Sequence, residues 1–413
     1  MRLSAVLLVV LVFLAASCPT LSLPIKAEHR TITVPDDYLT IQEAIGNANE
    51  GDTIFVKRGT YEEQALVINK TISLIGEDAN NTAINLHPPW IPTGGYTMNA
   101  QPEYGYDNPI KIQASDVEIS GFTITSDGGA ISISGNRTQI IGNIIKTALN
   151  IDGGSHQTIA ENTLTNGINS YGSYSSITSN KITESNQGIR VGGFSNMVYG
   201  NSVSRVSKIP GISLHGDGNI IAKNTVIDSQ SGLVCVLNDA GSNNFVYSNK
   251  LISNVYGLQV DGGNNNTFYA NDLINNSIGV RIGSSEILGK TTILLRNNFV
   301  DSIQQVSKSP SDTAGYFDNG EEGNYWSDYN GTDANGDGVG DTPYIIGGNL
   351  QDRCPLMAPV DISSVPLELP EWPEPRAEPF PTALFVVSIA SVAAGASLGL
   401  LVYLKKLRIF NSV

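Results

Sequence analysis

Cysteine, histidine and positive charge are scarce in this sequence. Three of the 413 residues are cysteine, so a framework of disulfide bonds is excluded as the main source of stability. Lysine and arginine together number 24, against 39 aspartates and glutamates, which gives a net charge of -15 at pH 7. Because nucleic-acid-binding proteins carry basic faces, this balance argues against a nucleic-acid partner and fits a secreted, solvated surface.

Long apolar runs are confined to the two ends of the chain. The run after Arg2 is too short to span a membrane and is typical of a secretory signal peptide, here residues 1–27. Residues 382–404 carry no charge and are long enough to cross a bilayer. The basic tail, 405–413, favours the cytoplasmic side, so the sequence predicts an exported protein anchored in the cell membrane by a C-terminal helix, with its main domain outside.

The segment before that helix, residues 359–381, contains seven prolines and is predicted to be a stiff, extended stalk. Two alternatives stay open for the ends of the chain. Cys18 follows a short apolar stretch that loosely matches a lipid-anchoring signal, and the C-terminal run also suits a sorting tail that is removed.

The most informative feature is an asparagine that recurs at intervals of 18 to 26 residues in the frame apolar-x-x-Asn-x-apolar. The recurring residues are Asn143, Asn162, Asn180, Asn201, Asn224, Asn249, Asn271 and Asn297. Such a repeat indicates one supersecondary unit stacked on itself. The stacked side chains are expected to form a hydrogen-bonded ladder, with a shorter one at Asn196, Asn219, Asn244 and Asn266.

Apolar and polar residues alternate around each asparagine, and a second strand pattern precedes it, as in Gly188–Val191 and Gly257–Val260. This period of two indicates strands whose apolar residues point inward. Cys235 is expected at such an inward position, although a bridge to Cys354 stays open. The sequence therefore predicts an all-β, right-handed parallel β-helix of roughly ten rungs.

The β-helix is predicted to fill residues 28–358, in three parts. Residues 28–70 form an N-terminal cap and the first strands, 71–303 the repeated coils, and 318–358 a C-terminal cap. Thr40 and Glu43 read as a capping box, which predicts a short amphipathic helix over residues 37–48 that covers the first rung. Residues 86–108 are expected to form a large loop on one side.

An acidic loop near the C-terminal cap has the spacing of a calcium site. Its predicted ligands are Asp333, Asn335, Asp337, Val339 and Asp341, with Gly338 allowing the turn. An EF-hand would place a bidentate glutamate where Tyr344 stands, so affinity should be modest unless Asp328 or Asp352 reaches in. We therefore predict a structural Ca²⁺ that fastens the cap, against the alternative of an acidic turn without a metal.

The outward faces of the repeated strands form the predicted binding surface. Small polar residues with an occasional charge or ring suit a chain of sugars. The candidate catalytic residues on this surface are Arg190, His215, Asp217, Asp239 and Asp261. Neighbouring rungs lie about 4.8 Å apart, so acids on successive rungs match the separations used in glycoside hydrolysis, whereas a lyase would use Arg190 or His215 as base. The alternative is that all five are solvated turn residues.

Several segments together resemble the NosD-like β-helix family, within the pectin-lyase-like superfamily. They are residues 31–45, Gly51–Val56, Gly59–Glu63, Ile75–Asp78, Gly323–Tyr329 and Asp333–Tyr344, and the likeness covers about residues 31–358. The resemblance implies the fold. It does not imply one activity, because the superfamily contains lyases, hydrolases, epimerases and noncatalytic surface proteins.

The same resemblance implies a role in maturing a copper reductase, which these residues support poorly. The four histidines, His29, His87, His156 and His215, are scattered, and no cluster of methionine or cysteine accompanies them to hold soft copper. Copper is therefore not the expected cofactor.

Three hypotheses about function follow. The leading one is a membrane-anchored extracellular β-helix that binds polysaccharide or surface glycan, or serves a structural envelope role, without catalysis. The second is a polysaccharide lyase or glycoside hydrolase that uses the five candidate residues. The third is a copper-maturation accessory protein.

Overall fold

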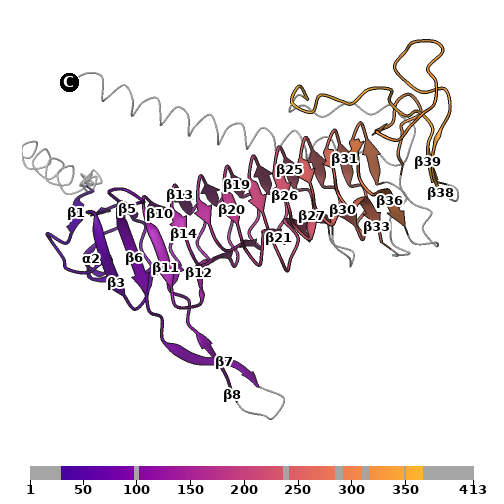
Figure 1. Ribbon diagram of the computed structural model, residues 1–413. Helices are drawn as coiled ribbons and strands as arrows, with labels where there is room; N and C mark the ends of the chain where they lie inside the picture. Colours follow the sequence, from indigo (N-terminus) through magenta and orange to yellow (C-terminus); the bar gives the residue numbers. More distant parts are fainter. Residues whose placement is uncertain are drawn as a thin grey trace, which may run out of the picture. The chain divides into compact units, whose positions relative to one another are not determined.

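The computed structural model describes residues 29–96, 102–235, 241–283, 292–308, 316–347 and 350–365. The described residues from Thr31 onward belong to one compact unit. In this unit the chain winds into a parallel β-solenoid whose coils each contribute one strand to each of three sheets (Figure 1).

Sheet A runs the length of the solenoid, and its strands pair only in parallel. Its strands are β1 (Thr31–Val34), β2 (Thr53–Val56), β5 (Ser73–Gly76), β10 (Glu118–Ser120), β13 (Gln139–Ile141), β16 (Thr158–Ala160), β19 (Ser176–Thr178), β22 (Met197–Tyr199), β25 (Ile220–Ala222), β28 (Phe245–Tyr247), β31 (Thr267–Tyr269) and β34 (Ile293–Leu295). The middle residue of each short strand points inward, so Ile140, Ile159 and Ile177 stack in register and are fully buried.

Sheet B follows sheet A in every coil after a tight turn. Its strands are β3 (Gly59–Glu63), β6 (Thr82–Leu86), β11 (Thr123–Ser126), β14 (Ile144–Ile145), β17 (Thr163–Leu164), β20 (Lys181–Thr183), β23 (Ser202–Ser204), β26 (Thr225–Ile227), β29 (Lys250–Ile252), β32 (Asp272–Ile274), β35 (Asn298–Val300) and β37 (Tyr325–Trp326). The inward column of this sheet passes through Ile145, Leu164 and Ile182.

Sheet C completes each coil. Its strands are β4 (Leu66–Ile68), β9 (Ile110–Ile112), β12 (Ala130–Ile133), β15 (Ala148–Ile151), β18 (Ile168–Ser170), β21 (Ile189–Val191), β24 (Ile212–Leu214), β27 (Ser231–Cys235), β30 (Tyr256–Val260), β33 (Ile278–Ile282) and β36 (Gln304–Lys308). Apolar residues of all three sheets meet in one continuous core along the solenoid.

A helix and two hairpins stand outside the three sheets. Helix α2 (Ile41–Asn47) begins after Thr40, whose side chain accepts a hydrogen bond from the Glu43 N–H, and it buries Ile41 and Ile45 at the first rungs. Strands β7 (Trp90–Tyr96) and β8 (Pro102–Tyr106) pair antiparallel and project from the solenoid (Figure 1). Strands β38 (Tyr344–Gly347) and β39 (Leu350–Asp352) form the second hairpin.

The turn from sheet A to sheet B explains the recurring asparagine. One residue of this turn adopts a left-handed conformation, such as Gly142 at φ 66° or Glu161 at φ 59°, and lets the chain bend from sheet A into sheet B. The asparagine that follows points into the core. Each Asn from 143 to 297 donates its backbone N–H and its side-chain N–H to the Oδ1 of the next Asn, at 2.9–3.2 Å.

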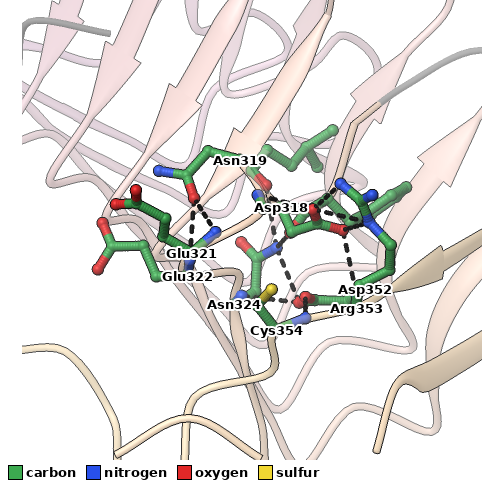
Figure 2. Close-up of polar contacts among 11 residues, drawn as sticks. Asp318, Asn319, Glu321, Glu322, Asn324, Asp352, Arg353 and Cys354 are labelled. Carbon is green, nitrogen blue, oxygen red and sulfur yellow. Dashed lines mark hydrogen bonds and ion pairs between the residues drawn. The ribbon is translucent and has the colours of Figure 1, made fainter. Parts of the chain in front are cut away.

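The ladder continues one step beyond the predicted repeat and ends at a carboxylate. Asn297 donates to Asn324, and Asn324 donates its backbone N–H to Asp352 Oδ2 at 2.7 Å. The Cys354 N–H also donates to this carboxylate (Figure 2). Trp326 Nε1 donates to it as well, at 2.9 Å. A Cβ on Gly323 would lie 1.9 Å from Asp352 Oδ1, so only glycine fits there.

Aromatic rings close the C-terminal end of the core. The Trp326 ring stacks on Phe299 of the preceding rung at 4.1 Å between centroids, and Tyr344 stacks on Trp326 at 4.2 Å. Arg353 pairs with the buried Asp318 beside this stack (Figure 2). Burial opposes ionisation of Asp318, but the hydrogen bonds from Arg353 outweigh it and lower the pKa of Asp318.

Several predictions about the fold are confirmed, some are corrected in detail, and others fall on residues outside the described ranges. The solenoid, both ladders and the capping helix are present. Among the described residues the sheets have 12, 12 and 11 strands, so the solenoid has about one coil more than the roughly ten predicted, and the predicted side loop contains the β7–β8 hairpin. The predicted signal peptide, the C-terminal helix, the basic tail and most of the stalk lie outside the described residues. Within the described ranges, no helix is long and apolar enough to cross a membrane.

We predict that replacing one inner rung of the asparagine ladder destabilises the whole solenoid. In Asn201→Ala, the N–H groups of Asn180 and the Ile177 carbonyl lose their buried partner. Buried polar groups without partners cost about 1–3 kcal/mol each, so the free energy of unfolding should fall by about 3–5 kcal/mol in urea denaturation. The exposed Asn330→Ala should change it by less than about 0.5 kcal/mol. Equal effects of the two changes would contradict the ladder as the source of stability.

We also predict that Asp352 makes stability depend on pH. Burial raises the pKa of its carboxyl from 3.8 to about 6, despite the opposing hydrogen bonds. The folded state therefore keeps this proton between about pH 4 and pH 6 while the unfolded chain has released it, so this stabilisation is lost as pH rises through about 6. The free energy of unfolding should decrease from pH 4 to pH 7, and in Asp352→Asn this decrease should be smaller by on the order of 2 kcal/mol. The control is Glu321→Gln, and an unchanged slope in Asp352→Asn would refute the prediction.

Candidate functional site

The outward column of sheet C forms a polar face that is interrupted at Val234, which is buried. Strand pairing places one residue of each rung in this column: Ser132, Asn150, Asn169, Arg190, Ser213, Val234, Gln259 and Arg281. This is the register expected from the repeat. Amide and hydroxyl groups dominate its first half, where Asn169 donates to Asn150 Oδ1 at 3.0 Å.

An exposed aromatic cluster lies beside the middle of this face, and we call it the aromatic patch. It consists of His156, Tyr171, Tyr174 and Phe194, on three successive coils. The His156 and Tyr174 rings stack at 5.5 Å between centroids, and Phe194 meets Tyr174 edge-on at 5.4 Å. Tyr171 and Tyr174 are 48% exposed and Phe194 is 51% exposed. Apolar rings held this open to solvent in adjacent rungs indicate a binding surface.

The turns from sheet C to sheet A hold these rings in place. His156 and Tyr174 occupy left-handed positions of successive turns, at φ 62° and φ 55°. The buried residue after each of them belongs to the second ladder, in which the Gln157 N–H donates to Ser175 Oγ and the Ser175 N–H donates to Asn196 Oδ1. The patch is therefore fixed by buried hydrogen bonds directly beneath it.

Tyr171 and Arg190 join the patch to the polar face. A Cβ on Gly192 would lie 2.7 Å from Cδ1 of Tyr171, so the tyrosine ring lies across this glycine on the next rung. The Arg190 guanidinium lies over the same ring, with Cζ 5.7 Å from its centroid. The tyrosine ring thus lies against the glycine and the cation of the next rung.

Two polar atoms at this surface are buried and lack a partner among the described residues. They are Arg190 Nε and Ser213 Oγ, which belong to paired residues of adjacent rungs. Buried polar atoms are satisfied in the great majority of cases, so these two need a partner that the described residues do not supply. His215 follows on the same coil as Ser213. Burial lowers the pKa of His215, and the positive charge of Arg190 lowers it further, so its imidazole is neutral at pH 7.

The structure brings only part of the predicted catalytic set together. Arg190 and His215 lie on adjacent rungs. Asp217 instead fastens a turn, since its Oδ1 accepts from the backbone of Gly241 at 3.0 Å and of Ser242 at 2.7 Å. Asp261 Oδ1 lies 3.4 Å from Arg281 Nη1, farther along the face. Asp239 lies outside the described residues, and a catalytic role for the five residues stays a prediction.

The acidic loop is held by hydrogen bonds from its own backbone. Asp333 accepts from the Gly336 and Gly338 N–H groups at 2.7 Å and 2.9 Å, and Asp341 Oδ2 accepts from the Ala334 N–H at 2.8 Å. Asp352 ends the asparagine ladder, and Asp328 accepts from the Tyr344 hydroxyl at 3.1 Å. The described part of the chain holds no group of three His, Cys, Asp or Glu side chains arranged for a metal. Calcium at Asp333, Asn335, Asp337, Val339 and Asp341 stays a prediction.

Sequence reasoning did not single out the aromatic patch. Tyr171 falls in a predicted outward column, but Tyr174 and Phe194 lie in turns, where no strand pattern marks them. One signal was available. Large rings precede the residues of the second ladder at Tyr174 and Phe194, where turns ordinarily carry small polar residues.

The chain belongs to the NosD family. The model of this family, described as periplasmic copper-binding protein (NosD), matches residues 115–331 of the 413, which is more than half of the chain. The match covers most of the repeated coils, the aromatic patch and the polar face of sheet C. No curated protein matches the chain.

Solved structures with a similar fold include several proteins that act on carbohydrates. A mannuronic acid specific polysaccharide family 6 lyase from human gut microbiota shares 15% identity over 72% of this chain and 86% of its own, with a TM-score of 0.48. XylC in complex with xylose shares 11% identity over 69% and 76%, with a TM-score of 0.49. The A-module of an Azotobacter vinelandii mannuronan C-5 epimerase shares 11% identity over 67% and 90%, with a TM-score of 0.43.

The described donors do not fit the copper that the family description names. His87 lies between Asp127 and Glu62, at 2.7 Å and 2.9 Å, while His156 stacks on Tyr174. Met197 stands on the outside of sheet A, and no described group combines three His, Cys, Asp or Glu residues for a metal. Copper prefers thiolate, thioether and imidazole ligands gathered at one point.

We predict that calcium, when bound to the acidic loop, measurably stabilises the folded protein. A ligand that binds only the folded state stabilises it by about 2.7 kcal/mol at a hundred times its dissociation constant. Excess Ca²⁺ should therefore raise the melting temperature of the chelator-treated protein, and Asp337→Ala should abolish the rise. The control is the exposed Glu321→Ala. A melting temperature that changes neither with calcium nor with chelator would contradict the structural role of the metal.

Proposed function

We propose that this member of the NosD family is an exported, surface-held β-solenoid that binds an extended glycan chain along sheet C. The aromatic patch is the proposed point of strongest contact, and Arg190 is its polar anchor. The single observation that carries the proposal is the exposure of three aromatic rings on adjacent coils, beside a cation whose buried Nε has no partner among the described residues.

The chemistry of the surface supports a sugar ligand. The flat side of a sugar ring carries C–H groups that pack on an aromatic face, while its hydroxyls need donors and acceptors around that contact. The amides of Asn150 and Asn169 and the hydroxyl of Ser213 supply such groups on neighbouring rungs. Because the column repeats at each rung, about every 4.8 Å, it suits a polymer running along the solenoid better than a single small molecule.

An enzyme is the second candidate, and the pair of Arg190 and His215 favours a lyase within that class. A neutral imidazole can accept the proton next to a sugar carboxylate, while the neighbouring guanidinium offsets the negative charge that develops. A glycoside hydrolase would need two carboxyl groups facing each other, but Asp217 and Asp261 are engaged in a turn and with Arg281. A noncatalytic binding role remains the leading proposal.

The location outside the cell rests on the two ends of the chain. We propose that residues 1–27 direct export and that residues 382–404 anchor the protein in the membrane. The description of the family as periplasmic supports an exported protein. The net charge of -15 keeps such a surface soluble and away from nucleic acid.

The test is retention of the protein on a panel of neutral and acidic polysaccharides in affinity electrophoresis. Removing both rings in Tyr174→Ala/Phe194→Ala should weaken retention at least about tenfold, equivalent to about 1.4 kcal/mol. Arg190→Ala should weaken it further for acidic polymers only. The same samples, followed by mass spectrometry, separate the candidates, because a lyase product is one water lighter than a hydrolysis product and a binding protein releases none.

Two control variants remove an exposed arginine and an exposed apolar side chain at positions outside the aromatic patch and sheet C. Arg205 is exposed and pairs with Glu184 in a turn between sheets B and C, and Leu39 is exposed before helix α2. Arg205→Ala and Leu39→Ala should leave retention unchanged. Retention that survives loss of the patch, or no retention on any polymer, would leave the structural envelope role as the remaining hypothesis.

A further inference from the structure

The outer face of sheet A carries an apolar stripe where a polar surface would be expected. On three successive strands, β22, β25 and β28, the residues that point away from the core are Met197, Tyr199, Ile220, Ala222, Phe245 and Tyr247. Ala222, Phe245 and Tyr247 form a buried cluster separate from the main core, and Tyr247 is only 2% exposed. An outward tyrosine buried to this extent must be covered from outside the solenoid.

The C-terminal segment after β39 supplies part of that cover. Val360 exchanges two hydrogen bonds of 2.8 Å with the Asn298 side chain, and Ile362 is 6% exposed. Val365 then packs on the cluster of Ala222, Phe245 and Tyr247. The first residues of the predicted stalk therefore run back along the outside of the solenoid instead of leaving it.

The direction of this segment shows where the chain goes next. Asn298 belongs to the coil of β34, whereas Val365 contacts the coils of β28 and β25, two to three rungs nearer the N-terminus. At about 4.8 Å per rung this is roughly 10–14 Å, close to the reach of five extended residues. The next strand in that direction is β22, with Met197 and Tyr199.

We propose that residues Pro366–Pro370, outside the described ranges, bind to this stripe as an intramolecular strap. Their sequence is Pro-Leu-Glu-Leu-Pro. In an extended chain, Leu367 and Leu369 fall on one face and Glu368 on the other. With about 3.1 Å per residue, the segment reaches the β22 rung and places the two leucines over Met197, Tyr199 and Ile220. The strap would hold the start of the stalk against sheet A and leave the face of sheet C open.

Photo-crosslinking of the full chain in lipid nanodiscs tests the strap. p-Benzoylphenylalanine is introduced at position 367 or 369, and at 368 as the matched control that faces away. We expect cross-links within one chain to the peptides that contain Met197–Lys223, at least fivefold more from 367 and 369 than from 368. Tyr199→Asp/Ile220→Asp should abolish them, whereas Gln139→Asp, three rungs away on the same face, should not.

Other outcomes would overturn the proposal. Cross-links between two chains would make the stripe a contact between copies, and cross-links to lipid or to other parts of the solenoid, or none, would mean that the strap does not bind there. A circular dichroism spectrum and melting temperature equal to those of the unmodified protein show that each variant is folded. Because the stripe is outside the core and away from sheet C, retention on polysaccharide should be the same in all of these variants.

Discussion

The buried asparagine ladder is the interaction on which the rest of this structure depends. Each coil must turn sharply between sheets A and B. The backbone N–H and C=O groups of this turn face an apolar core, so they need hydrogen-bond partners there. Asparagine supplies a donor and an acceptor at one position, so every coil satisfies its neighbour. The ladder thereby fixes the register of all three sheets, because a coil shifted by one residue would lose both its apolar column and its amide partner.

A ladder of identical steps must also end, and its two ends differ. At the start, the Phe122 N–H donates to Asn143 Oδ1, so the first step is completed by backbone. At the C-terminal end, Asp352 accepts the hydrogen bond that a further asparagine would have accepted. Its carboxyl is buried, and burial raises the pKa of this group to about 6. The C-terminal cap is therefore held by the same bonds as the coils, and stacked aromatic rings cover its apolar part.

Two of the outer faces have separate proposed tasks. Sheet C carries the aromatic patch and a polar column, and its turns rest on the second ladder, so a binding surface gains its rigidity from the fold itself. Sheet A carries the apolar stripe that the C-terminal segment begins to cover. A protein proposed to be anchored through its C-terminus would in this way keep its attachment and its ligand on different faces.

The sequence by itself determined the solenoid, its inward columns, both ladders and the capping helix, because each is written as a local period or motif. It also placed Arg190 and His215 on neighbouring rungs, since strand register follows from the repeat. Only the tertiary structure decided which groups are free to act. Asp217 and Asp261 bond to partners more than 20 residues away in the chain or on the next rung, and Asp352 joins the ladder from a strand 28 residues beyond Asn324. The aromatic patch likewise exists only because turns of three coils stack, and no spacing within one coil reveals it.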